Sequence, residues 1–292
     1  MSMIQQAWQN PLRPVSRMLL ILLSLVSMAL AQTAAALVGD GVLLVTHLPA
    51  LGNTVAGILY PVLAMAGFWA LCRFGLREPL SAWRMGPVRL KPVWCVTAVL
   101  MPALVCGAYL LLPGQWSVAA DRVDTGSILV IGIFYLGIGT GIVEEAVFRG
   151  FIMTALERRW NRWAAVLLPS VLFGLVHIIG SDLDMLSIVQ LVLAGTMVGV
   201  LFSLVALESG SIWNGALIHG VWNAATLFLH IGPETNAQSL INYLPETKDF
   251  LLTGGDFGME ASIISVAAYA LFAGMALFLL RKGKKRADCG PA

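Results

Sequence analysis

The chain has 292 residues, of which 58% are hydrophobic and only 12% are charged, and its mean hydropathy is +0.83. Ordinary soluble domains carry about 25% charged residues, so this composition excludes a soluble enzyme or binding domain. The formal net charge is only +2, and we expect no nucleic-acid partner.

Eight long apolar runs follow one another along the chain. A helix needs about 20 apolar residues to cross the hydrocarbon core of a bilayer. The runs are continuous rather than alternating, which favours helices over a β-barrel. They cover residues 18–38, 54–72, 93–112, 127–156, 163–180, 186–207, 211–231 and 261–280. The sequence therefore predicts an all-α polytopic membrane protein with about eight transmembrane helices, in contact with the lipid bilayer.

The first apolar run has a second interpretation. It contains Ala29-Leu30-Ala31 followed by Gln32, a pattern that is also typical of the site where a signal peptide is removed. The run continues beyond that point to a length that can cross a membrane. We therefore expect a retained helix, with removal of residues 1–31 as the alternative.

The basic residues indicate the orientation of the chain. If the N-terminus is cytoplasmic, 16 of the 18 Lys and Arg residues fall in cytoplasmic segments, and only Arg122 and Lys248 fall outside. This asymmetry follows the positive-inside rule and predicts that both termini are cytoplasmic. The short loops further suggest the inner membrane of a bacterium.

Three parts of the chain can be distinguished. Residues 1–126 would form three transmembrane helices, and residues 127–231 would form a catalytic core of helices four to seven. Residues 232–292 would contain a partly ordered outer loop, the last transmembrane helix and a basic cytoplasmic tail. The cysteines show neither metal-ligand spacing nor a disulfide framework; they are Cys72, Cys95, Cys106 and Cys289.

The fourth run contains two adjacent carboxylates, Glu144 and Glu145, followed by Arg149. An ionisable group at membrane depth costs at least about 2.5–3.5 kcal/mol and marks a candidate functional site. Glu145 and Arg149 are four residues apart on a helix and can pair, so a structural ion pair is as good an interpretation as catalysis. Glu144 lies about 100° further round the helix, where the same arginine does not neutralise it. It is a candidate general base.

Three further polar residues lie in later runs: His177, His219 and Asn223. Each alone could be a structural hydrogen-bonding group between helices. His219 and Asn223, four residues apart, share one helix face. Together with Glu144, the set can activate water and can donate hydrogen bonds to an oxyanion. Glutamate and two histidines could also bind zinc.

The ordered series Glu144-Glu145-x-x-x-Arg149, Phe173-x-x-x-His177 and His219-x-x-x-Asn223 resembles the CPBP family. This family contains the type II CAAX prenyl endopeptidases and the bacterial Abi proteins, which are often called intramembrane metalloproteases. The resemblance covers about residues 127–231. It implies a hydrolase that cleaves a membrane-embedded or membrane-associated protein or peptide.

By this resemblance, Glu144 and His177 would activate water, and His219 and Asn223 would form the oxyanion hole. Glu145 and Arg149 would orient Glu144, and Phe173 belongs to the second motif. We expect no bound metal, because Asn223 is a poor zinc ligand, although zinc remains the alternative. The other functions that fit buried ionisable residues are a proton-coupled transporter or relay and a non-catalytic bacteriocin-immunity protein.

The predicted length of the fifth helix conflicts with the placement of all these residues in a single site. At 1.5 Å per residue, His177 would lie nearer the outer face than Glu144, His219 and Asn223 if residues 163–180 formed a full transmembrane helix. A short or displaced fifth helix would remove this conflict.

Overall fold

The computed structural model describes residues 14–288. Within this range, each of the eight apolar runs contains a helix. Six helices are long and apolar enough to cross a membrane: Leu19–Thr46, Pro49–Leu76, Pro92–Leu110, Thr125–Glu157, Met185–Ser209 and Ile263–Gly283. The chain is therefore a nearly all-α integral membrane protein, as predicted. The two remaining helices have only 15 and 16 residues, so eight complete crossings stay a prediction.

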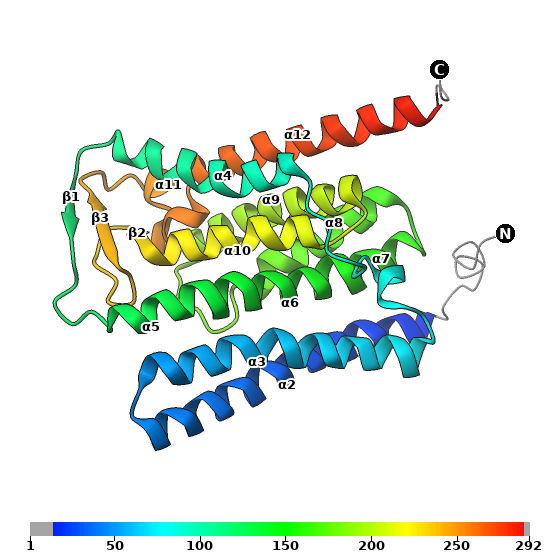
Figure 1. Ribbon diagram of the computed structural model, residues 1–292. Coiled ribbons are helices and arrows are strands. Elements are labelled where there is room, and N and C mark those ends of the chain that lie inside the picture. Colours follow the sequence, from blue (N-terminus) through cyan, green and yellow to red (C-terminus); the bar gives the residue numbers. More distant parts are fainter. Residues whose placement is uncertain (1–13, 289–292) are drawn as a thin grey trace.

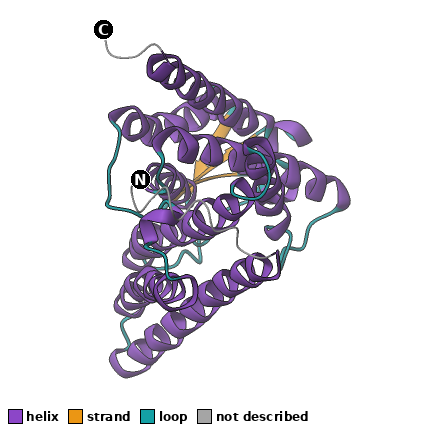
Figure 2. Cartoon of the chain, turned by 90° about the vertical axis from the view of Figure 1, so that its right-hand side faces the viewer, coloured by secondary structure: helices purple, strands orange, loops and turns teal. Residues whose placement is uncertain are grey.

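The helices form a layered bundle (Figure 1). A hairpin of α2 and α3 lies along one side and packs on the fourth long helix, and α10 packs between that helix and α4. On the other side, α12 packs on α9 and α4. Figure 2, seen from the end, shows the same order, with the hairpin at the bottom and α12 at the top. The bounds are α2 Pro14–Thr46, α3 Pro49–Ala70, α4 Pro92–Leu110, α8 Arg162–Val176, α9 Met185–Ser209, α10 Trp213–Phe228 and α12 Ile263–Asp288.

The fourth long helix changes its winding along its length. A π-helical stretch, Ile131–Thr140, follows α5 (Thr125–Val130), and a second one, Ala146–Ile152, precedes α7 (Met153–Glu157). Between them lies a short α-helical segment, α6, Gly141–Glu145. Such π-helical segments occur frequently at functional sites. Glu144 and Glu145, which were predicted to be functional, are the last two residues of this α-helical segment between the two π-helical stretches.

Polar side chains set where several helices begin. Asp124 accepts a hydrogen bond from the Ser127 N–H (2.8 Å) at the start of α5. Asp184 accepts one from the Ser187 N–H (2.6 Å) at the start of α9. These side chains satisfy backbone donors that have no partner within the helix.

Three separate segments of the chain form a small sheet that the apolar pattern did not predict. Only its central strand lies in the predicted outer loop after residue 231, and the helix predicted over residues 211–231 ends at Phe228. The strand β3 (Ile241–Pro245) pairs antiparallel with β1 (Gly114–Ser117) and parallel with β2 (Leu229–Ile231). After α11 (Phe250–Thr253), two 3₁₀ turns, Gly255–Phe257 and Met259–Ala261, lead into α12. The loop is therefore largely ordered, and its last part returns to the helices.

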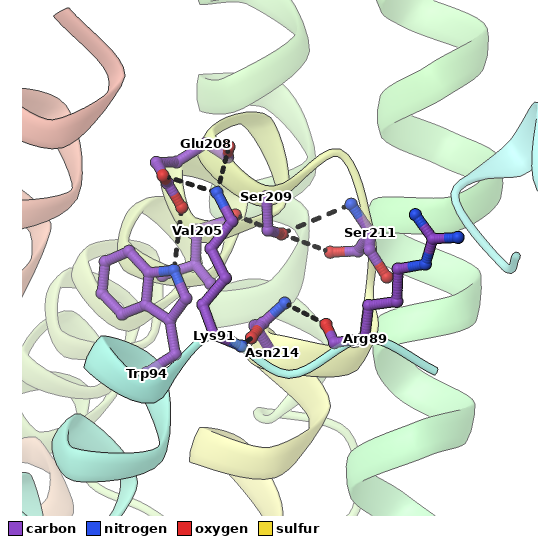
Figure 3. A network of polar contacts seen from close by, with 8 residues as sticks. All are labelled: Arg89, Lys91, Trp94, Val205, Glu208, Ser209, Ser211 and Asn214. Carbon is purple, nitrogen blue, oxygen red and sulfur yellow. Dashed lines mark hydrogen bonds and ion pairs between the residues drawn. The ribbon is translucent and has the colours of Figure 1, made fainter. Parts of the chain in front are cut away.

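A polar network lies at the end of the bundle opposite the small sheet (Figure 3). Lys91 Nζ lies 2.7 Å from Glu208 Oε1, and Trp94 Nε1 donates to Glu208 Oε2 (2.9 Å). The buried Asn214 side chain accepts from the Lys91 N–H (2.8 Å) and donates to the Arg89 carbonyl (3.1 Å). These bonds hold the segment that leads into α4 against the turn between α9 and α10.

The beginning of α2 and the end of α12 lie at the same end of the bundle, and the small sheet lies at the other (Figure 1). This arrangement agrees with termini on the same side of the membrane. Which side that is stays a prediction: a reporter tag placed before residue 1 and one placed after residue 292 should both report the cytoplasm, because the basic residues cluster there. A C-terminal tag that is active outside the cytoplasm would contradict the orientation.

Candidate active site

Glu145 forms a fully buried ion pair. Its Oε1 lies 2.7 Å from Arg149 Nη1, and both side chains have 0% relative exposure. The arginine also donates from Nη2 to the carbonyl oxygen of Gly199 on α9 (2.9 Å). The predicted pairing of these two residues is therefore present, and it links the fourth helix to α9.

Aromatic rings surround the guanidinium of this pair. The Arg149 Cζ atom lies 4.8 Å from the centre of the Phe173 ring and 5.2 Å from that of Phe202. A cation over aromatic faces gains electrostatic attraction, about 2 kcal/mol or more when it is desolvated. Phe173, which the sequence placed in the second motif, thus contacts the ion pair of the first motif.

The third motif reaches the carboxylates because two helices approach each other unusually closely. On α10, Gly220 faces the carbonyl oxygen of Gly137 in the first π-helical stretch, and a Cβ atom at position 220 would collide with that oxygen. Glycine permits this approach because it has no side chain. The contact brings α10, and with it His219, against the glutamate pair.

His219 is buried between the two carboxylates. Its Nδ1 lies 3.3 Å from Glu145 Oε1, and its Nε2 lies 3.8 Å from Glu144 Oε2. The imidazole also stacks on the Phe202 ring, with centres 4.9 Å apart. Glu144 is more accessible than Glu145, with 22% side-chain exposure, and its Oε2 makes no hydrogen bond within the described residues.

A small cavity of about 50 Å³ adjoins this cluster, and His177, His219 and Asn223 all line it. The fifth helix is shorter than predicted: α8 ends at Val176, and the expected continuation to residue 180 is wrong. Because His177 follows a short helix, it reaches the same cavity as His219, which removes the conflict in depth.

The ring of His177 has a defined orientation. Its Nδ1 lies 2.6 Å from the carbonyl oxygen of Phe173. A carbonyl only accepts hydrogen bonds, so Nδ1 carries the proton and Nε2 of the neutral ring is left as an acceptor. Asn223 is held in a similar way, since its Nδ2 donates to the Leu136 carbonyl (3.2 Å) in the first π-helical stretch. One N–H of that amide remains for another partner.

All seven residues that the motifs named lie in this cluster. Glu144 does not line the cavity, and within residues 14–288 no hydrogen bond joins it to His177. His219 connects the two, because it contacts Glu144 and also lines the cavity.

One further carboxylate lines the cavity, and the sequence did not indicate it. Glu260 lies on the last 3₁₀ turn before α12, and its Oε2 accepts a hydrogen bond from Trp222 Nε1 (2.9 Å). It belongs to the predicted outer loop, directly before the last apolar run. Nothing in its sequence neighbourhood distinguishes it, because its position depends on how the ordered loop folds back.

Within residues 14–288, the possible zinc ligands are not grouped as one metal site. In the described part of the chain, no group of three His, Cys, Asp or Glu side chains is placed to hold a metal ion. The two histidine Nδ1 atoms already face the Phe173 carbonyl and Glu145. Whether the protein binds zinc stays a prediction.

The buried ion pair should be essential for stability. Arg149→Ala leaves the Glu145 charge buried without its partner, which typically costs about 3–5 kcal/mol. We expect a markedly lower midpoint of thermal unfolding for the purified protein. The control is Arg162→Ala, which removes a partly exposed arginine 3.7 Å from Glu157 and should cost only about 0–1 kcal/mol. Equal midpoints for the two variants would contradict the structural role of Arg149.

Comparison with known proteins identifies the part of the chain that carries the motifs. A search of curated proteins found no match, and a search of solved structures found none. Residues 125–225 match the family model described as type II CAAX prenyl endopeptidase Rce1-like. This range contains all three motifs. The comparison confirms the predicted resemblance to the CPBP proteases: residues 125–225 of this membrane protein are similar to the Rce1-like type II CAAX prenyl endopeptidases.

Proposed function

We propose that this protein hydrolyses a peptide bond of a membrane-embedded or membrane-associated substrate, with Glu144 as general base. The observation that carries the proposal is the contact of one histidine, His219, with both adjacent carboxylates and with the cavity lined by His177 and Asn223. The similarity of residues 125–225 to the Rce1-like endopeptidases supports the class of reaction; the roles of the residues are our inference.

The first step is attack of water on the substrate carbonyl. The Glu144 side chain is 22% exposed, and its buried Oε2 makes no hydrogen bond within the described residues, so this oxygen has free lone pairs that can accept a proton from water. The unprotonated Nε2 of His177 is a second acceptor for the same water. The oxygen of that water forms a bond to the carbonyl carbon, and the carbonyl oxygen becomes an oxyanion.

His219 and Asn223 would stabilise this oxyanion. The remaining amide N–H of Asn223 can donate a hydrogen bond, and His219 can donate from Nε2 when both ring nitrogens carry protons. Donors fixed in place before the reaction contribute most in a site shielded from water. The stacking of His219 on Phe202 and the bond from Asn223 to Leu136 supply that fixation.

The second step breaks the carbon–nitrogen bond. The proton taken from water returns from Glu144 to the leaving nitrogen, the oxyanion reforms a carbonyl, and the products are a carboxylic acid and an amine. Glu144 is regenerated as a carboxylate. Glu145 and Arg149 take no part in these transfers and hold Glu144 and His219 in position. No metal ion is required by this sequence of steps.

The substrate class is testable in cells. A bacterial inner membrane fits the short loops of the chain, and the prenylated C-a-a-X tail of the family description is one candidate substrate. The experiment compares the N- and C-termini of membrane proteins in wild-type cells and in a Glu144→Ala strain. New termini that occur only in the wild type would identify the substrate. Identical termini in both strains, with the protein expressed, would contradict the proposed proteolysis.

A further inference from the structure

An apolar groove lies between the fourth helix and α10, apart from the cavity at the histidines. Its volume is about 370 Å³, which is within the range of small-molecule sites. Its walls include residues from the fourth helix, from α10 and from the segment that precedes α4: Ile138, Ile142, Leu217, Val221, Val88 and Leu90.

The groove exists because small residues form its floor. Gly137 and Gly220, where the two helix backbones approach each other, both line the groove. The indole N–H of Trp213, a polar group in its lining, already donates to the Gly86 carbonyl (2.6 Å). The lining therefore offers a ligand almost only apolar contacts, which suit a hydrocarbon chain.

A positive charge lies beside this hydrocarbon site. Arg89 stands between the groove residues Val88 and Leu90, and its side chain is exposed. The neighbouring Arg84 and Lys91 are paired with Glu157 and Glu208.

Arg89, unlike Arg84 and Lys91, has no acidic partner among the described residues. Its guanidinium makes no ion pair within residues 14–288, and it points away from Glu208 in Figure 3. Its backbone carbonyl accepts the hydrogen bond from Asn214, which fixes the backbone of this residue between the groove residues Val88 and Leu90.

We propose that the groove and Arg89 together form a binding site for one anionic phospholipid, with an acyl chain in the groove and the phosphate at the guanidinium. The argument is charge complementarity. The segment of residues 73–91 is predicted to be cytoplasmic, and the cytoplasmic leaflet is rich in anionic lipids, which attract basic side chains near its surface. An apolar groove alone would not select among lipids, whereas an unpaired arginine beside it selects for a net negative head group.

The test uses native mass spectrometry of the purified full-length protein. The protein is exposed to phosphatidylglycerol or phosphatidylcholine with identical acyl chains. We expect one phosphatidylglycerol to be retained per chain, in preference to phosphatidylcholine. Arg89→Gln should reduce this retention about fivefold, because one basic side chain near the surface contributes about that factor. The matched control is Arg159→Gln, which removes another exposed arginine of the predicted cytoplasmic side that does not line the groove.

A second variant tests the hydrocarbon part of the site. Ala224 lines the groove, and Ala224→Phe should fill it and lower the retention of phosphatidylglycerol while leaving Arg89 intact. Its size-exclusion profile shows whether it is folded; if it is not, the comparison of Arg89→Gln with Arg159→Gln still decides. Equal retention of both lipids, or equal losses in both arginine variants, would overturn the proposal. A bound peptide or a second copy of the chain in place of lipid would overturn it as well. The readout requires no cleavage, so the result is independent of the proposed proteolysis.

Discussion

Glu144→Gln should remove peptide cleavage while the protein still inserts and folds. The substitution keeps the size of the side chain but removes the base. General acid–base catalysis contributes about 10²–10⁴-fold, so turnover should fall by at least that factor. Little structure should be lost, because Glu144 Oε2 makes no hydrogen bond with the described residues and the side chain is partly exposed.

Glu145→Gln is the matched control for this prediction. It makes the same chemical change one residue later, but it discharges the partner of the fully buried Arg149. It should therefore lower the unfolding midpoint and the amount of folded protein, in addition to activity. Loss of catalysis is distinguished from loss of folded protein by measuring turnover per folded molecule. Folding is followed by size exclusion and thermal unfolding. Near-normal turnover of Glu144→Gln would show that another group is the base.

The sequence predicted much of the fold because lipid imposes a simple rule. A backbone in hydrocarbon must satisfy its own hydrogen bonds, so each long apolar run is a helix. All eight runs contain one in the structure. The small sheet was not predicted, because the strands β1 and β3 are more than 120 residues apart and lie outside the apolar runs. Their pairing depends on how the helices bring two loops together.

The site was predicted as a set of residues but not as a geometry. Spacing placed Glu145 with Arg149 and His219 with Asn223, since residues four apart share a helix face. It did not show that His219, rather than His177, contacts Glu144. That contact follows from the approach of α10 to the fourth helix at Gly137 and Gly220. Glu260 was missed for the same reason, because its place depends on tertiary folding rather than on a local pattern.

Asn223→Ala should lower the chemical step by about 10²–10³-fold, the usual loss when one oxyanion donor is removed. Substrate binding should change little, because only the transition state carries the charge that Asn223 stabilises. The variant also leaves the Leu136 carbonyl without the donor seen in the structure, which can cost about 1–3 kcal/mol of stability. The kinetic effect must therefore be measured on folded protein, as a fall in kcat at nearly constant KM.

Asn223→Asp distinguishes an oxyanion donor from a metal ligand. A carboxylate is a better zinc ligand than an amide but cannot donate a hydrogen bond when ionised. If His177, His219 and Glu144 held zinc, Asn223→Asp should bind the metal at least as tightly and keep activity better than Asn223→Ala. If Asn223 is a donor, the aspartate variant should be the less active of the two, because its negative charge repels the oxyanion. Metal content of the purified protein and cleavage with and without a tight chelator complete the test. Stoichiometric zinc, chelator-sensitive cleavage and an active aspartate variant would together replace the glutamate mechanism by a metalloprotease mechanism.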